Sequence, residues 1–376
     1  MRRGLAAVLA AVLLALPALV QAASPGPRIG LVLGGGGARG AAHIGVLEEL
    51  ERLRVPVHCV AGTSMGALVA GAWVAGRSPA EMREALRAAD WNEMFLDGAG
   101  DAELDLRARR LRQRFLPGSE TGIVDGGAVS PPALVQGQRI KFFLNALVRA
   151  ETGEPLIEQL PIPLSIIATD IGTGERIVMR DGPLTEAMRA SMAVPGLVDN
   201  LPVRELRERC GAEVVIAVNV GSPPLPAEAI AGVLSITAQM VALLTEQNVG
   251  ASLAQLTPRD LLIRPELGDI TAADFARHAE AAERGRAAMQ LHEPALAALA
   301  VDERTWAAWR RGARVAERDV PRVDRIEVTG LKRVAPELLL RHVRQRSGAP
   351  LDAEALAIDL ERAFGDGHYE RLDYTV

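Results

Sequence analysis

Two stretches near the beginning of the chain change from apolar, strand-like residues to Ala-rich, helical residues through a glycine-rich turn. The first passes from Ile29–Leu33 through Gly34–Gly40 into a helical pattern with apolar residues at Ile44, Leu47, Leu50 and Leu53. The second passes from strand-like Val55–Ala61 through Gly62-Thr63-Ser64-Met65-Gly66 into a predicted helix over Met65–Ala75. The order strand, loop, helix, strand, turn, helix predicts an α/β fold with a parallel sheet.

The second turn has the spacing of a nucleophile elbow. In such an elbow a serine lies on a sharp bend between a strand and a helix, and glycine two positions before and after it removes side chains that would clash. The helix that follows directs its N-terminal amides toward negative charge that develops near Ser64. A pattern of five residues also occurs by chance in ordinary tight turns, so the flanking strand and helix carry this interpretation.

The first turn contains the spacing Gly35-x-Gly37-x-x-Gly40, which formally matches a dinucleotide-binding loop. Such a loop is followed by an acidic residue at the end of the next strand, about 20 residues on. Here the next strand leads into Ala61-Gly62-Thr63-Ser64 instead, which argues against a nucleotide. Consecutive glycines at a helix N-terminus can also direct several N–H groups at one oxygen, so the loop fits an oxyanion hole better.

The rest of the chain continues the alternation and then changes character. Strands are predicted over 162–168, 213–220 and 261–263, and helices over 80–89, 138–150, 184–190, 233–249 and, interrupted at Pro294, 274–299. The first domain is expected to end between 290 and 320. A separate β-α-α-β module is predicted after it, with strands at 323–329 and 369–376 and helices at 336–346 and 352–364.

Composition excludes some classes of protein. The chain has 376 residues, 49% of them hydrophobic, and a net charge of −5, which fits two or three globular domains and argues against disorder and a nucleic-acid partner. Cys59 and Cys210 are the only cysteines, and both lie in apolar or strand-like sequence. We expect two buried thiols rather than a disulfide or a thiolate metal site.

The N-terminus resembles a secretory signal peptide over residues 1–22. Arg2 and Arg3 precede an apolar run, and Val20-Gln21-Ala22 places small residues before a cleavage site. An uncleaved membrane anchor is the weaker alternative, because the run is short for a bilayer span and Pro17 interrupts it. The mature protein is therefore expected in the periplasm, associated with the outer membrane, or secreted.

Taken together, the motifs resemble those of bacterial patatin-like phospholipases. The likeness continues through 168–175, 189–196 and Asp199-Asn200-Leu201-Pro202, and covers about residues 28–290. It implies a three-layer α/β sandwich around a mostly parallel sheet, a lipid ester substrate and an active site at a membrane surface. It also implies that Ser64 is the nucleophile and that Gly62 and Gly66 shape the elbow around it. The oxyanion hole implied by the resemblance consists of Gly35, Gly36, Gly37, Arg39 and Gly40.

The sequence departs from the family at the catalytic base. Members of the family use a Ser–Asp dyad whose aspartate lies in an Asp-Gly-Gly or Asp-Gly-Ala turn, between the Ser-x-x-x-Pro-Gly segment and Asn-x-Pro. Here Pro195-Gly196 continues directly into Leu197-Val198-Asp199-Asn200, so that turn and its hairpin are missing. Asp125-Gly126-Gly127 lies too far upstream to replace it. Asp199 is the nearest carboxylate and a weak candidate for a substitute base, although capping of the following helix is the simpler role.

Other polar residues are given structural roles. His278 and His292 follow Ser64 in the chain order of hydrolase triads, but both lie in charged helical sequence typical of a surface. His43 follows the glycine loop and is expected to pack at its base. The basic run Arg107, Arg109, Arg110, Arg112 and Arg114 fits a solvated face better than a site for lipid headgroups.

The C-terminal module resembles the POTRA domains that precede outer-membrane barrels, notably at 323–330 and 365–374. Patatin-like proteins with a POTRA domain and a barrel form a secreted class of lipases, but no barrel sequence follows before Val376. We therefore expect a signal peptide at 1–22, a patatin-like domain at 28–290, a helical linker at 291–320 and a partial POTRA-like module at 321–376.

These inferences give two hypotheses for function. The first is a serine lipid acyl hydrolase of the phospholipase A or esterase type, acting through Ser64 without a metal or an organic cofactor. The second is a catalytically inactive patatin-like lipid-binding protein, because a serine hydroxyl is a weak nucleophile without a base to take its proton. The missing Asp-Gly-Gly turn favours the second hypothesis, that the protein no longer has hydrolase activity.

Overall fold

The structure, a computed structural model, describes residues 26–94, 110, 122–124, 127–129, 137–193, 199–222, 224, 228, 230, 233–316 and 318–376. Its main sheet has six strands in the order β6-β5-β2-β1-β7-β8. These strands are β1 (Ile29–Leu33), β2 (Cys59–Thr63), β5 (Leu164–Thr169), β6 (Arg176–Met179), β7 (Val214–Val218) and β8 (Leu261–Ile263). A separate antiparallel pair consists of β3 (Gly122–Val124) and β4 (Gly127–Val129).

The sheet is parallel except at one edge, where β6 pairs antiparallel with β5. The predicted α/β fold with a mostly parallel sheet is therefore confirmed. Strand β6 was not predicted, because it has only four residues and is at most partly buried. The second predicted strand begins four residues late, at Cys59 rather than Val55.

The predicted helices form with their ends shifted by a few residues, and further helices form at Trp91–Met94, Val203–Cys210 and Glu303–Gly312. They are α2 (Ala42–Leu53), α3 (Met65–Val74), α4 (Pro79–Ala88), α5 (Trp91–Met94), α7 (Gln138–Val148), α8 (Leu184–Ala193), α9 (Val203–Cys210), α10 (Val233–Leu253), α11 (His278–Leu291), α12 (Glu293–Ala297), α13 (Glu303–Gly312), α14 (Pro336–Leu340) and α15 (Ala353–Gly365). Short 3₁₀ turns are η1 (Gly37–Ala41), η2 (Ala150–Thr152), η3 (Ile157–Gln159) and η5 (Phe275–Arg277).

Helices cover both faces of the sheet and make three layers. Successive strand residues point to opposite faces, so Leu31 and Leu33 of β1 belong to the core shared with α2, α3 and α11, while Val32 faces the other side. There Val32 packs with Leu206 of α9 and with Val249 of α10. Buried side chains on both faces explain why the strands are nearly continuous apolar runs.

Residues that follow α11 also belong to the main core. Leu296 of α12 is buried in it, and Leu299, Trp309 and Ala313 pack against it. The predicted domain boundaries themselves stay predictions. Helices α12 and α13 nevertheless contact the body of the fold directly.

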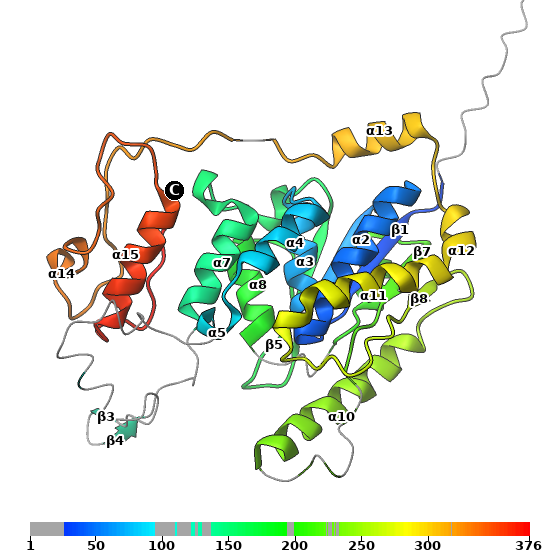
Figure 1. Cartoon of the computed structure of the whole chain (residues 1–376), viewed down its shortest axis with the longest axis horizontal. Coiled ribbons are helices and arrows are strands. Elements are labelled where there is room, and N and C mark those ends of the chain that lie inside the picture. Colours follow the sequence, from blue (N-terminus) through cyan, green and yellow to red (C-terminus); the bar gives the residue numbers. More distant parts are fainter. Residues whose placement is uncertain are drawn as a thin grey trace, which may run out of the picture.

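The C-terminal segment forms its two predicted helices, α14 and α15, but not its two predicted strands. Residues 323–329 and 369–376 are not in strands, and the bridge between Arg322 and Pro350 is isolated. Their alternating pattern was therefore a wrong indication of strands, because neither run has a neighbouring strand to pair with among the described residues. The segment packs instead on α7, where Phe142 meets Leu360 and Phe364 of α15 (Figure 1).

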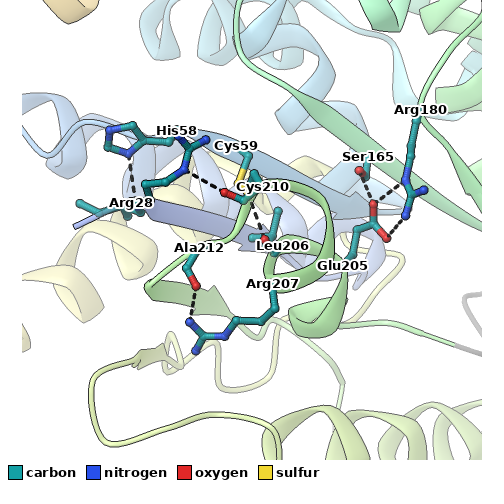
Figure 2. Close-up of a disulfide and its surroundings, with 11 residues drawn as sticks. Arg28, His58, Cys59, Ser165, Arg180, Glu205, Leu206, Arg207, Cys210 and Ala212 are labelled. Carbon is teal, nitrogen blue, oxygen red and sulfur yellow. Dashed lines mark hydrogen bonds and ion pairs between the residues drawn. A yellow bond between two sulfur atoms is a disulfide. The ribbon is translucent and has the colours of Figure 1, made fainter. Parts of the chain in front are cut away.

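The two cysteines form a disulfide between β2 and the last residue of α9, with the Cα atoms 6.6 Å apart (Figure 2). The expectation of two free thiols was wrong. The residues are 151 positions apart in sequence, so their pairing depends on α9 packing across β1 and β2. Nothing in the local sequence of either cysteine reveals that packing.

Candidate active site

The glycine loop and the elbow meet at the carboxyl edge of the sheet. Strands β1 and β2 are parallel neighbours, with Leu33 paired to Gly62, so the segments that follow them leave the sheet side by side. The glycine loop continues into η1 and α2, and the elbow into α3. The carboxyl ends of adjacent parallel strands are the usual place for a ligand in open α/β sheets.

Ser64 has the strained backbone of an elbow, with φ 54° and ψ −122°. A left-handed conformation is rare for a residue with a side chain and is found at functional turns. The flanking glycines are required sterically: a Cβ at Gly66 would overlap the Leu33 carbonyl oxygen, and one at Gly62 would lie 2.7 Å from the Ala67 Cα atom. Ser64 itself is half-buried, so its hydroxyl is accessible at the start of α3.

Ser191 of α8 holds the elbow from the side. Its hydroxyl oxygen accepts a hydrogen bond from the Ser64 N–H at 2.7 Å and donates one to the Ile167 carbonyl of β5 at 2.5 Å. The side chain is buried, so neither interaction has water as a ready substitute. Ser191 therefore fixes the nucleophile's backbone against the neighbouring strand.

The glycine loop lies directly against the nucleophile. A Cβ at Gly35 would be 3.2 Å from the Ser64 Cβ. The N–H of Gly35 donates to the Asn200 Oδ1 at 3.1 Å, and the Asn200 amide donates back to the Gly35 carbonyl at 3.1 Å. Gly35 thus shapes the loop, but its N–H is already taken and is not available to an oxyanion.

Three other N–H groups of the glycine loop and the elbow are not engaged. Within the described residues, those of Gly36, Gly37 and Met65 have no hydrogen-bond acceptor. Gly37 has φ +56°, and a Cβ at Gly36 would lie 2.6 Å from the Val220 carbonyl oxygen, so both positions suit only glycine. Two donors from the loop and one from the residue after the nucleophile match the usual composition of an oxyanion hole.

Arg39 and Gly40 have structural roles. The buried Arg39 guanidinium donates to the Val220 carbonyl at 2.9 Å and to the Ile270 carbonyl at 2.6 Å, which ties the loop to the segments after β7 and β8. These two bonds hold the Arg39 side chain against those segments. Gly40 makes room for Met65, whose Cβ would lie 2.6 Å from a Cβ at that position.

His43 of α2 packs beneath the loop, as expected. It is fully buried, and its Nε2 lies 2.8 Å from the Gly34 carbonyl oxygen. Burial lowers the pKa of His43 to about 4. The imidazole is therefore neutral near pH 7 and donates its Nε2 proton to the loop, which leaves it no proton-accepting role toward Ser64 through that nitrogen.

Asp199 lies next to the elbow through its backbone, because the Thr63 hydroxyl donates to the Asp199 carbonyl at 2.9 Å. Its carboxylate faces elsewhere: Oδ2 forms an ion pair with the Arg176 Nε at 2.8 Å, and Oδ1 accepts from the Ser252 hydroxyl at 3.4 Å. Burial raises the pKa of the Asp199 carboxyl, although Arg176 acts in the opposite direction. It does not cap α9, whose N-cap is Pro202.

No base contacts the nucleophile in the part of the chain that the structure describes. The Ser64 hydroxyl has no hydrogen bond to a histidine or a carboxylate there. His278 and His292 lie at the two ends of α11, and neither is bonded to Ser64. Asp125 and Gly126 lie outside the described residues, as do Arg107, Arg109, Arg112 and Arg114.

Comparison with known proteins shows that the part of the sequence that contains these residues matches one protein family. The family model for patatin-like phospholipases fits residues 31–214, which include the loop, the elbow, Ser191 and Asn200. The chain carries a patatin-like phospholipase domain. Homologues of that domain include proteins of the NTE family.

Relatives of the patatin-like domain occur in bacteria and animals. An NTE-family protein of Mycobacterium tuberculosis is 36% identical over 175 residues, which is 46% of this chain and 40% of that protein. A patatin-like phospholipase domain-containing protein of Caenorhabditis elegans is 36% identical over 215 residues, 52% of this chain and 14% of its own length. The chain thus spans less than half the length of these relatives.

Among solved structures, ExoU of Pseudomonas aeruginosa in complex with SpcU aligns with 77% of this chain and 59% of its own, at 16% identity and a TM-score of 0.37.

Ser191, Asn200 and Arg176 had no predicted roles. Ser191 lies in the 189–196 segment and Asn200 in the Asp-Asn-Leu-Pro segment. The family resemblance includes both segments but implied no function for these two side chains. Each acts on a residue more than 100 positions away, Ser191 on Ser64 and Asn200 on Gly35. Only the fold brings such pairs together.

Proposed function

We propose that the patatin-like domain is a lipid acyl hydrolase in which Ser64 attacks the carbonyl carbon of a lipid ester. The Ser64 oxygen forms the new bond, its proton passes to a solvent water molecule, and the carbonyl oxygen becomes an oxyanion that the N–H groups of Gly36, Gly37 and Met65 would stabilise. Collapse of the tetrahedral intermediate expels the alcohol, which takes up a proton and leaves an acyl-enzyme. Water then releases the fatty acid and regenerates Ser64. The free N–H groups around the strained elbow are the observation that carries this proposal.

Turnover in this chain should be slow because the usual aspartate base is missing from the sequence between Gly196 and Leu197. Removing one member of a catalytic serine constellation costs about 10³ to 10⁶ in rate, while the oxyanion hole alone retains part of the acceleration. The second candidate function, a lipid-binding protein without hydrolysis, rests on that same deletion and on the engagement of Asp199 by Arg176. The two candidates differ in whether Ser64 reacts at all.

A fluorophosphonate probe distinguishes these candidates, because it phosphonylates only a serine held against an oxyanion hole. We expect slow, stoichiometric labelling at Ser64 in the full chain. Ser64→Ala should abolish the labelling, and Ser78→Ala, at the N-cap of α4, should leave it unchanged. Complete absence of labelling in a folded protein would support the non-catalytic candidate and overturn ours.

We also propose that the protein is exported, with cleavage after Ala22. Support comes from the signal-like N-terminus and from the Cys59–Cys210 disulfide, because disulfides persist mainly in oxidising compartments. Cell fractionation and mass spectrometry of the N-terminus test this. A periplasmic or extracellular protein beginning at Ala23 is expected, and a cytoplasmic protein that keeps Met1 with both thiols reduced would contradict it.

A lipid substrate requires access to a membrane or a micelle, and we propose that the carboxyl edge of the sheet faces that surface. Within the described residues, no helix has both the length and the apolar character to cross a bilayer. Flotation of the protein with phosphatidylcholine and phosphatidylglycerol vesicles would test peripheral binding. Protein that remains unbound to both would contradict a membrane-facing site.

We propose further that residues 321–376 are a partial POTRA-like module, supported by the order of α14 and α15 and by the likeness at 323–330. If so, the amides of α14 and α15 should be protected from hydrogen exchange in solution, as in a folded module. Fast exchange throughout both helices would contradict this assignment.

A further inference from the structure

A cavity of about 930 Å³ lies at the opposite end of α3 from the nucleophile. Its walls come from the ends of α3 and α7, from the segment between η2 and β5, and from the chain that follows α13. Ser64 precedes α3, whereas Trp73 and Gly76 at the other end line the cavity. A helix of ten residues is about 15 Å long, so the cavity is separate from the candidate active site.

Helix α13 and the segment after it are fixed over this cavity. The Trp309 indole N–H donates to the Val57 carbonyl at 3.0 Å, and its ring stacks on Trp306 with centroids 4.6 Å apart. Beyond the helix, the chain runs along this edge of the molecule toward α14 (Figure 1). Val315 lies against Gly76, where a Cβ would be 3.3 Å from its own Cβ, and the Arg318 Nη1 would be 2.9 Å from a Cβ at Gly153.

The cavity has an excess of positive charge. Six arginines line it, against two acidic residues, Glu51 and Asp319, among the described lining; the arginines are Arg77, Arg149, Arg310, Arg311, Arg314 and Arg318. Glu51 is also engaged, because it accepts the Trp73 indole N–H at 3.0 Å. Such an excess of like charge around one cavity favours an anionic ligand.

Four of these arginines form two groups. Arg77 and Arg149 are held in place by Glu81, at 3.3 and 2.7 Å, and Arg77 also donates to the Leu147 carbonyl at 2.8 Å. In the part of the chain that the structure describes, Arg310 and Arg311 at the end of α13 have neither a hydrogen-bond nor an ion-pair partner. Their guanidinium groups are therefore free to bind an anion in bidentate fashion.

One side of the same cavity is apolar, with Trp73, Leu156, Leu160 and Ile162 in its lining. We propose that this cavity binds a phosphate-bearing amphiphile, with the phosphate at Arg310 and Arg311 and the acyl portion against the apolar wall. Its volume lies within the range of small-molecule sites, about 300–1,000 Å³. The proposal does not depend on the reactivity of Ser64.

Titration of the full chain with short-chain lipids tests the proposal. Dihexanoyl phosphatidic acid, dihexanoyl phosphatidylcholine and inorganic phosphate serve as probes, and tryptophan fluorescence reports on Trp73 and Trp309 in the wall. The Ser64→Ala variant is used throughout, so that hydrolysis of a probe cannot confuse the readout. We expect saturable binding of phosphatidic acid, weaker at high salt, and little response to the other two probes.

Charge-reversal variants on α13 test whether binding depends on arginines of the cavity lining or on positive charge elsewhere on the helix. Arg310→Glu combined with Arg311→Glu should weaken phosphatidic acid binding at least about tenfold. Arg304→Glu, in the first turn of α13 and outside the cavity lining, should leave it unchanged. Equal binding by the double variant would overturn the proposal, as would the absence of saturable binding. Inorganic phosphate bound as tightly as the lipid would show a free-phosphate site and overturn the assignment of the acyl portion.

Discussion

At the scale of single residues, the site depends on side chains that bind backbone groups of the reacting segments. Ser191 holds the Ser64 N–H, Asn200 holds both backbone groups of Gly35, and His43 holds the Gly34 carbonyl. None of them needs to touch the substrate. Together they fix where the nucleophile and the free N–H groups lie, which is the preorganisation that catalysis by an oxyanion hole requires.

Ser191→Ala should slow fluorophosphonate labelling of Ser64 about tenfold and lower the free energy of unfolding by about 1–3 kcal/mol, because the buried Ser64 N–H loses its acceptor. Labelling kinetics and urea unfolding measure the two effects. Ser78→Ala is the matched control: it removes the cap of α4, at a typical cost of about 1 kcal/mol, far from the elbow. Equal labelling rates in both variants would show that Ser191 does not position the nucleophile.

His43 makes stability depend on pH in a defined direction. Because its pKa is about 4 in the folded protein and 6.5 for a histidine exposed to water in the unfolded chain, the unfolded chain binds a proton that the folded one excludes. The contribution is fully present above pH 6.5 and is lost as pH falls toward 4, up to about 3 kcal/mol. Urea unfolding at about pH 7 and about pH 4.5 should show that the native protein loses more stability between these pH values than the His43→Gln variant does. Equal losses in the two proteins would contradict a neutral buried His43.

At the scale of elements, the parts predicted correctly are those set by local pattern. Apolar runs placed β1, β5, β7 and β8, and helical periodicity placed α2, α3 and α11, because both reflect burial of one or two faces. Strand β6 and the disulfide were missed for a shared reason. A strand of four residues such as β6 is stabilised by its neighbour β5, and Cys210 reaches Cys59 only because α9 crosses the sheet.

Helices α2 and α11 cross at two glycines, so added volume there should destabilise the fold. A Cβ at Gly45 would overlap the Ala282 carbonyl oxygen, and one at Gly285 would overlap the Ala42 carbonyl oxygen. We expect Gly45→Ala to lower the free energy of unfolding by about 1–3 kcal/mol. Gly250→Ala is the control: nothing lies within 4 Å of its Cβ position in α10, so higher helix propensity should raise stability by up to about 1 kcal/mol. A neutral Gly45→Ala would mean that the helices are less closely packed.

Reduction of the disulfide should destabilise the protein by about 4 kcal/mol, because the bond closes a long loop in the unfolded chain. Urea unfolding with and without dithiothreitol measures this. A variant with both Cys59→Ala and Cys210→Ala should show no response to the reductant. An unchanged midpoint for the native chain, with reduction confirmed by mass spectrometry, would contradict a stabilising role.

At the scale of the whole molecule, the sequence predicted the architecture better than the detail of the site. The glycine loop and elbow were placed correctly against each other because two adjacent parallel strands leave little freedom in how their following segments meet. Which residues of the loop are hydrogen-bonded within the protein, and which keep a free N–H group, could not be predicted from the sequence. Gly35 and Arg39 are engaged by distant groups, Asn200, Val220 and Ile270, and we therefore propose Gly36, Gly37 and Met65 as the donors.

The C-terminal segment shows that an alternating sequence pattern alone does not predict a strand. Its alternating runs at 323–329 and 369–376 resemble strands, but a strand forms only where another supplies hydrogen bonds. Among the described residues none does, and the segment instead packs α15 on α7. Alternation therefore indicated which side chains could be buried, not the backbone structure that would bury them.

The central claim is that the elbow and its oxyanion donors are ready for chemistry and that only the base is missing. The most direct test compares ester hydrolysis by the native chain with that of a variant carrying a hairpin with an Asp-Gly-Gly turn inserted after Gly196. The same hairpin with asparagine in place of its aspartate is the control. We predict that the aspartate hairpin raises kcat/KM at least about 10³-fold and that the asparagine hairpin does not. Native activity already equal to that of the aspartate variant, and abolished by Ser64→Ala, would contradict the claim, because a base would then be present.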